Sequence, residues 1–182
     1  MTTRSVATER VKDLRAALTT MPDARTWLAC ALVFVLFVAC AAPLGLLSGL
    51  LRPTSPHLAP GDVVRTAVLI FIQPAFVEEL VFRGLLLPRD AGLVRGRRLL
   101  VMAGGALALY VASHPINAMV FRPDVLHVFA DPAYLVLATL LGLACTAAYF
   151  ISKSLWPPVV MHWLTVLVWL WFLGGEALLI RT

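Results

Sequence analysis

Charged residues are scarce in this chain of 182 residues: they make up 14 % of it, whereas 60 % of the residues are hydrophobic. Soluble domains are typically about 45–50 % apolar. This composition, with a mean hydropathy of +0.88, excludes a soluble globular protein and indicates one domain embedded in a lipid bilayer. The net charge of +5 suits contact with anionic lipid headgroups and gives no case for nucleic-acid binding.

Cysteine is also scarce, because the chain has only Cys30, Cys40 and Cys145, and all of them lie in apolar runs. Their spacing provides neither a disulfide framework nor a zinc pattern. We therefore expect three small, buried packing residues. The N-terminal residues do not resemble a secretory signal either, because the first apolar run exceeds the roughly 7–15 residues of a signal core and no clear cleavage site follows it.

Five long hydrophobic runs organise the chain. We expect transmembrane helices at about residues 27–51, 63–87, 99–121, 134–151 and 156–173. Each run is near the roughly 17–25 residues that cross about 30 Å of hydrocarbon, and a helix satisfies its own backbone in lipid. The predicted fold is an all-α polytopic bundle of about five transmembrane helices with a buried polar site. It would form a single domain, residues 27–182, after a cytoplasmic N-terminal segment, residues 1–26.

Lysine and arginine are unevenly divided between the two ends of the predicted bundle. If the spans alternate in direction, ten of these residues share one side: Arg4, Arg10, Lys12, Arg15, Arg25, Arg89, Arg95, Arg97, Arg98 and Lys153. Four share the other side: Arg52, Arg65, Arg122 and Arg181. Basic residues concentrate in cytoplasmic loops. We therefore expect a multi-pass protein with a cytoplasmic N-terminus, in the plasma (inner) membrane if the source is bacterial.

Five ionisable side chains interrupt the predicted spans: Glu78, Glu79, Arg83, His114 and His162. A charged group at the bilayer centre costs roughly 2.5–3.5 kcal/mol, so such groups face a protein interior or a wet cavity, where they usually mark function. A lone membrane histidine is more often a satisfied hydrogen-bond partner between helices. Two histidines together with two carboxylates favour an intramembrane active site.

The second predicted span carries both carboxylates. Glu79 and Arg83 are four residues apart and share a helical face, which predicts an ion pair. Glu78 lies about 100° further around the helix, so it is left to bind and deprotonate a water. We expect Pro74, one turn earlier, to kink the helix. Snorkelling at a helix end is the alternative, but apolar residues continue beyond Arg83.

The third predicted span carries His114, which follows Tyr110 by four residues and precedes Asn117 by three, so all three share a face. The small residues at 103–108 are expected to let a neighbouring helix approach closely. The other two histidines, His57 and His127, lie in predicted loops, and we expect them to have no catalytic role.

These polar residues form three spaced patterns: Glu78-Glu79-x-x-x-Arg83, Tyr110-x-x-x-His114 and His162-x-x-x-Val166. In order and spacing they resemble the EExxxR, FxxxH and HxxxN/D motifs of the CPBP family of intramembrane proteases, which includes the CAAX prenyl endopeptidases. The first motif is complete, the second has tyrosine for phenylalanine, and the third has valine for asparagine or aspartate. The resemblance covers about residues 63–173.

The resemblance implies a glutamic-type peptidase in which Glu78 activates a water, His114 shares or shuttles the proton, and His162 steadies the oxyanion. Val166 cannot donate a hydrogen bond, so another group would replace the missing donor. The candidates for that part are Thr165, Asn117 and Trp163. The residues expected to support the site are Glu79, Arg83, Tyr110, Asn117 and Thr165.

The resemblance also implies no cofactor and no catalytic metal. The chain has no HExxH motif, although a zinc site of Glu78, His114 and His162 is geometrically possible. The implied substrate is the C-terminal tail of a membrane-anchored or prenylated protein. The short build and the sequence around His162 resemble the branch of the family that processes C-terminal sorting signals.

Two other functions remain open. A catalytically inactive scaffold or immunity protein that binds peptides is favoured by Val166. A component of a proton-coupled transporter is possible because intramembrane Glu and His also form proton relays, but the chain has no transport-style repeat.

Overall fold

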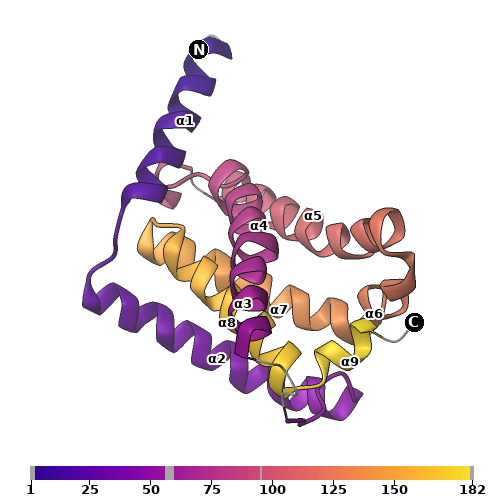
Figure 1. The fold of residues 1–182 in the computed structure, drawn as a ribbon. Coiled ribbons are helices and arrows are strands. Elements are labelled where there is room, and N and C mark those ends of the chain that lie inside the picture. The colour runs from indigo at the N-terminus through magenta and orange to yellow at the C-terminus, as the bar shows by residue number, and fades with distance from the viewer. Residues whose placement is uncertain (1–2, 56–59, 95, 181–182) are drawn as a thin grey trace.

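The computed structural model describes residues 3–55, 60–94 and 96–180. These residues form helices and short connections, with no strand among them, which confirms the predicted all-α membrane fold. In chain order (Figure 1) the elements are α1 (Thr3–Thr19), α2 (Ala24–Ser48), α3 (Pro60–Ile70), η1 (Phe71–Phe76), α4 (Val77–Glu79), η2 (Leu80–Leu85), η3 (Ala91–Leu93), α5 (Arg97–Phe121), η4 (Pro123–Val125), α6 (Leu126–Phe129), α7 (Pro132–Ser152), α8 (Trp156–Phe172) and α9 (Gly175–Ile180).

Three of the described helices, α2, α5 and α7, are long and apolar enough to cross a membrane, and α8 is a shorter apolar helix. Much of their outer surface is aliphatic. On α2, for example, Leu32, Val35 and Leu36 are 58–67 % exposed, as side chains facing lipid tails would be. The protein is an integral membrane protein. The five passes and the cytoplasmic N-terminus stay predictions.

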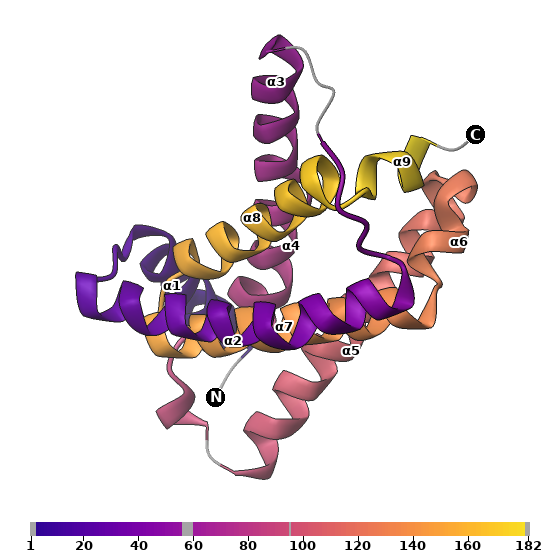
Figure 2. The ribbon, with the colours of Figure 1, turned by 90° about the horizontal axis from the view of Figure 1, so that it is seen from below.

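Helices α2 and α7 lie side by side and build the larger core (Figure 2). Small residues such as Ala41 and Ala148 are buried between them, so the two backbones approach closely. Cys30 and Cys145 are free thiols buried in this core, as predicted. The prediction is wrong for Cys40, which is also free but exposed, because it lies on a face of α2 turned away from that core.

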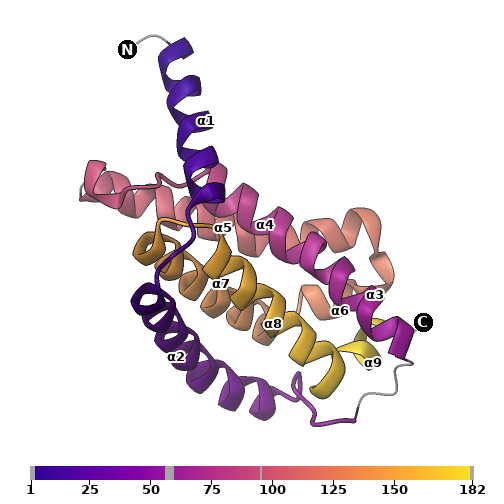
Figure 3. The ribbon, with the colours of Figure 1, turned by 60° about the vertical axis from the view of Figure 1, so that its left-hand side comes forward.

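The segment from α3 to η2 is a helix interrupted at one residue. Gln73 has extended backbone angles, φ −135° and ψ 116°, and Pro74 has no backbone N–H with which to continue the helical hydrogen bonds. The predicted kink at Pro74 is therefore present. Beyond it the chain resumes as α4 and η2, where π-type turns widen the helix. Helix α8 lies between this segment and α7 (Figure 3).

The predicted basic side of the bundle is held together by hydrogen bonds. The Arg89 guanidinium donates to the Lys153 carbonyl and to the Thr20 hydroxyl, and the Lys153 ammonium lies 2.8 Å from the Asp90 carboxylate. The hydrogen bond from Lys153 lowers the pKa of Asp90 below its usual value. The Trp156 indole donates to a carbonyl at the end of α1. The first part of α1 projects beyond this end of the bundle (Figure 1).

Close packing between α5 and α7 occurs at Gly142. A Cβ added there would lie 2.6 Å from the Leu107 side chain and 3.0 Å from the Tyr110 ring. The predicted close approach at 103–108 is wrong for Gly104 and Gly105, where an added Cβ meets no atom of the described residues within 4 Å. The α7 backbone can therefore lie against the face of α5 that carries Tyr110, which brings α7 to the predicted site.

Candidate active site

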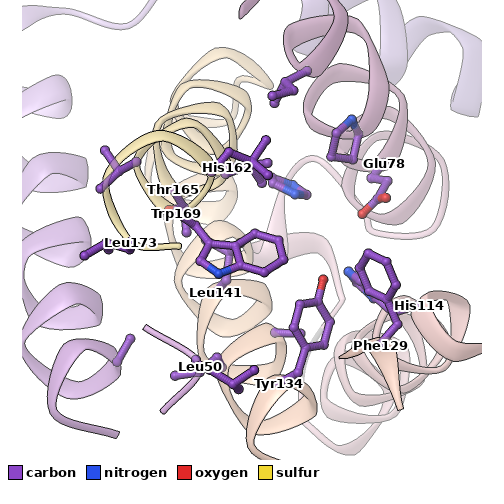
Figure 4. Close-up of a pocket in the computed structure, with 18 of the residues that line it drawn as sticks. Leu50, Glu78, His114, Phe129, Tyr134, Leu141, His162, Thr165, Trp169 and Leu173 are labelled. Carbon is purple, nitrogen blue, oxygen red and sulfur yellow. The ribbon is translucent and has the colours of Figure 1, made fainter. Parts of the chain in front are cut away.

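A cavity of about 920 Å³ lies between α2, the α3–η2 segment, α5, α7 and α8. Most of its wall is apolar. Glu78, His114 and His162, the three residues predicted to be catalytic, all border it, and the side chains in Figure 4 surround one open space. Three separate predicted spans thus contribute to a single site.

Glu78 reaches the cavity from α4, one turn after the break at Gln73. Its Oε2 atom is shielded from solvent and accepts no hydrogen bond from any residue that the structure describes. In Figure 4 the carboxylate points into the space that His114 borders. The Oε2 atom of Glu79 also has no partner among the described residues, but of the two carboxylates only Glu78 borders the cavity, so Glu78 is the one placed to meet a bound molecule.

Glu79 points away from that space into a buried ionic network. Its Oε1 accepts a hydrogen bond from Arg83 at 2.9 Å, and the side chains of the pair are 0 % and 2 % exposed. A second Arg83 nitrogen donates to the Gly142 carbonyl at 2.9 Å, and the guanidinium carbon lies 4.6 Å from the Tyr110 ring centre. The predicted pair between Glu79 and Arg83 therefore forms, and Arg83 also ties η2 to α7.

The same Glu79 oxygen lies 2.9 Å from Nδ1 of His162. Because a carboxylate can only accept, Nδ1 must carry the proton, which leaves Nε2 as the imidazole nitrogen available to the cavity. Sequence reasoning paired Glu79 with Arg83 alone and missed this contact. Glu79 and His162 are 83 residues apart, so the spacing of residues along one helix could not predict this hydrogen bond.

His114 is held by its own helix and by aromatic rings. Its Nδ1 lies 2.9 Å from the Tyr110 carbonyl oxygen. The Tyr110 ring lies between the two imidazoles, with centroid distances of 4.9 Å to His114 and 6.1 Å to His162, and is nearly perpendicular to both. The two histidines therefore both pack against the Tyr110 ring, although they belong to α5 and α8.

Two aromatic residues of the cavity were missed by sequence reasoning. Tyr134 on α7 lies 5.5 Å from His114 and 5.9 Å from Trp169 on α8, measured between ring centroids. Both rings border the cavity near Glu78 and His114 (Figure 4). Neither belongs to a spaced polar motif, so no sequence signal distinguished them from ordinary apolar packing residues.

The predicted substitutes for the donor missing at Val166 differ in their availability. The Thr165 hydroxyl donates to the Met161 carbonyl at 2.8 Å, and the Trp163 indole donates to the Ala67 carbonyl at 2.9 Å, so both protons are already used. Asn117 borders the cavity with an exposed side chain. Val166 itself also lines the cavity.

The remaining histidines lie elsewhere. His127 is exposed on α6, with Nδ1 3.0 Å from the Asp124 carbonyl oxygen, and His57 lies outside the described residues. Within residues 3–55, 60–94 and 96–180 there is no group of three His, Cys, Asp or Glu side chains placed to hold a metal ion.

Comparison with known proteins identifies the family to which this chain belongs. The family model described as type II CAAX prenyl endopeptidase Rce1-like matches residues 60–168, more than half of the chain. The match runs from α3 into α8 and includes Glu78, His114 and His162. No curated protein and no solved structure matched the chain. The chain therefore belongs to the Rce1-like type II CAAX prenyl endopeptidases, a family of intramembrane endopeptidases that act on membrane-associated substrates.

Proposed function

We propose that this protein is a glutamic-type intramembrane endopeptidase that hydrolyses a peptide bond near the C-terminus of its substrate, with Glu78 as the general base. One observation carries the proposal: Glu78, His114 and His162 reach a single cavity from three separate helical segments. Family membership supports the peptidase activity in general. The assignment of each residue rests on the chemistry of the site.

Glu78 is suited to activate a water because it borders the cavity and, unlike Glu79, is not bonded to Arg83 or His162. In the proposed step Glu78 takes a proton from a water while the water oxygen bonds to the peptide carbonyl carbon. The carbon–nitrogen bond then breaks, and the proton passes to the leaving amine nitrogen, with His114 sharing or relaying it. The products are a carboxylic acid and an amine. A positioned base of this kind contributes about 10²–10⁴-fold to the rate.

His162 is suited to stabilise the oxyanion of the tetrahedral intermediate. With Nδ1 bound to Glu79, an imidazolium at this position presents Nε2–H as a donor, and the Glu79 carboxylate offsets its charge. Arg83 holds that carboxylate in place from the other side. A donor aimed at an oxyanion is worth about 2.7–4 kcal/mol.

The cavity is suited to hold an apolar substrate segment. Its volume of about 920 Å³ lies in the range of roughly 300–1,000 Å³ typical of ligand pockets, and aliphatic and aromatic side chains form most of its wall. We therefore place the C-terminal tail of a membrane-anchored, prenylated or sorting-signal protein there. We propose that the reaction needs no metal and no cofactor.

We also propose the extent of the membrane domain and the side of the membrane on which the N-terminus lies. Residues 27–182 would form one multi-pass domain, and the cytoplasmic N-terminus is supported by the basic residues gathered between α1, the η2–α5 connection and the α7–α8 turn. In a bacterium this would be the plasma (inner) membrane. A topology reporter fused to the N-terminus should be active on the cytoplasmic side, and activity on the opposite side would reverse the assignment.

Reconstituted protein with two internally quenched peptides tests the activity. One peptide is a farnesylated CAAX sequence, and the other is a sorting tail with a hydrophobic helix followed by a basic cluster. We expect the wild type to cleave one of them and Glu78→Gln to lose cleavage while its melting temperature is kept. Glu176→Gln, a carboxylate on α9 that does not border the cavity, is the matched control. Equal cleavage by Glu78→Gln would remove Glu78 from the mechanism.

A non-catalytic peptide-binding scaffold is the second candidate, favoured by Val166 at the cavity wall. It predicts that the wild-type protein binds these peptides without cleaving them. Turnover that depends on Glu78 rules it out.

A further inference from the structure

Tyr134 is rigidly placed at the cavity wall. Asp131 caps the start of α7, and its Oδ1 accepts hydrogen bonds from the backbone of Ala133 at 2.8 Å and of Tyr134 at 3.3 Å. The phenol ring is surrounded by other rings: centroid distances are 5.0 Å to Phe129, 5.5 Å to His114 and 5.9 Å to Trp169. Backbone and ring are therefore both held, so the position of the hydroxyl oxygen is set before any substrate binds.

The Tyr134 hydroxyl donates no hydrogen bond to any residue that the structure describes. The ring borders the cavity, and Figure 4 shows the oxygen pointing into the space between Trp169 and the Glu78–His114 side. Within the described part of the chain no group accepts its proton. Thr165, by contrast, donates its hydroxyl hydrogen bond to a backbone carbonyl. Tyr134 is half-buried, and its hydroxyl is open to the cavity, so it is available to a partner that arrives with the substrate.

We propose that the Tyr134 hydroxyl donates the second hydrogen bond to the oxyanion, beside Nε2 of His162. The proposal rests on the function proposed above. A phenol suits this part because it remains protonated at neutral pH and adds no charge that would pair with the Glu78 carboxylate. Preorganised donors in a water-poor site stabilise developing charge far more than they do in water. Tyr134 thereby supplies the hydrogen-bond donor that Val166, which lines the same cavity from α8, lacks.

Tyr134→Phe tests the proposal because it deletes one oxygen and keeps the ring contacts. With the peptide that the wild type cleaves, we expect kcat to fall about 10²-fold, as for other oxyanion donors, while KM and the melting temperature stay near wild-type values. Tyr149→Phe is the matched control: Tyr149 is a buried tyrosine on the same helix that packs away from the cavity, and its variant should keep the wild-type kcat.

A graded variant separates hydrogen-bond donation from a structural role. Fluorotyrosines at position 134 keep the shape of the side chain but acidify the phenol. At a pH where the phenol stays protonated, kcat should rise with its acidity, whereas a packing role would leave kcat constant. Constant kcat across the series would overturn the proposal.

Further variants distinguish this proposal from the proposed function. If cleavage is lost in Glu78→Gln but unchanged in Tyr134→Phe, the proposed role of Tyr134 as an oxyanion donor is overturned, while the peptidase mechanism stands. A loss of kcat in Asn117→Ala with none in Tyr134→Phe would move the donor to Asn117 and also overturn it. Unchanged cleavage by Glu78→Gln would instead contradict the peptidase mechanism itself.

Discussion

The imidazole Nδ1 of His162 on α8 donates a hydrogen bond of 2.9 Å to the carboxylate Oε1 of Glu79 on α4. Both side chains are almost completely buried, with exposed fractions of 0 % and 2 %. The orientation of the α8 histidine is therefore set by a carboxylate on another helix. Arg83 bonds the same oxygen, so changes at any of the three residues should affect the other two.

Glu79→Gln should damage both stability and turnover. The amide leaves the Arg83 guanidinium buried without its counter-charge, and removing one partner of a buried pair costs about 3–5 kcal/mol. The amide can also present its NH₂ group to His162, which releases the imidazole from its orientation. Chemical unfolding in detergent and kcat measured on the same preparation check this. A variant with wild-type stability and kcat would show that the contact between Glu79 and His162 is dispensable.

Arg83→Lys should be destabilising although the charge is kept. Arg83 donates to Glu79 and to the Gly142 carbonyl from two different nitrogens and lies over the Tyr110 ring. A lysine ammonium cannot reproduce that fork, so one hydrogen bond is lost, worth about 1.5–3 kcal/mol when the donor is charged. Arg25→Lys, an exposed position on α2, is the control. Equal unfolding midpoints for the two variants would contradict the prediction.

Gly142→Ala and Gly104→Ala should have opposite effects. At Gly142 the new methyl group lies 2.6 Å from the Leu107 side chain, and overpacking of this kind costs about 1–3 kcal/mol. At Gly104 the methyl group meets no atom within 4 Å in the part of the chain that the structure describes, so alanine should stabilise the helix by roughly 0.5–1 kcal/mol. Unfolding midpoints of the two variants provide the comparison. A stabilised Gly142→Ala variant would mean that α5 and α7 do not pack as described.

His114→Ala and His127→Ala compare two histidines in different surroundings. His114 borders the cavity, whereas His127 is exposed on α6. As a proton-relay group, His114 should contribute about 10²–10⁴-fold, so its alanine variant should lose that factor in kcat. His127→Ala should retain the wild-type rate. Similar losses in both variants, or in neither, would remove His114 from the proposed mechanism.

Local interactions were predictable from the sequence. The kink at Pro74 follows from the lack of a backbone N–H in proline. The pair between Glu79 and Arg83 follows from a spacing of four residues on a helix. The apolar runs near 27–51, 99–121, 134–151 and 156–173 are helices within a few residues of their predicted bounds. Each of these features depends on side chains that are close in the chain.

Contacts between helices were not predictable in the same way. The bond from His162 to Glu79, the place of Tyr134 at the cavity and the close approach at Gly142 join segments far apart in the sequence. The burial of Cys145 and the exposure of Cys40 also depend on which face of a helix meets a neighbour. A single sequence gives the spacing along each helix but not the angle and rotation with which helices pack.

The amino-acid sequence alone determined that this is an all-helical membrane protein with carboxylates and imidazoles inside its apolar spans, because hydropathy and helical spacing are local properties. Only the tertiary structure decided that Glu79 holds His162, that one Glu78 oxygen has no partner among the described residues, and that Tyr134 faces the same cavity. These relationships arise from the packing of whole helices, in which each contact depends on the shapes of all the neighbouring side chains.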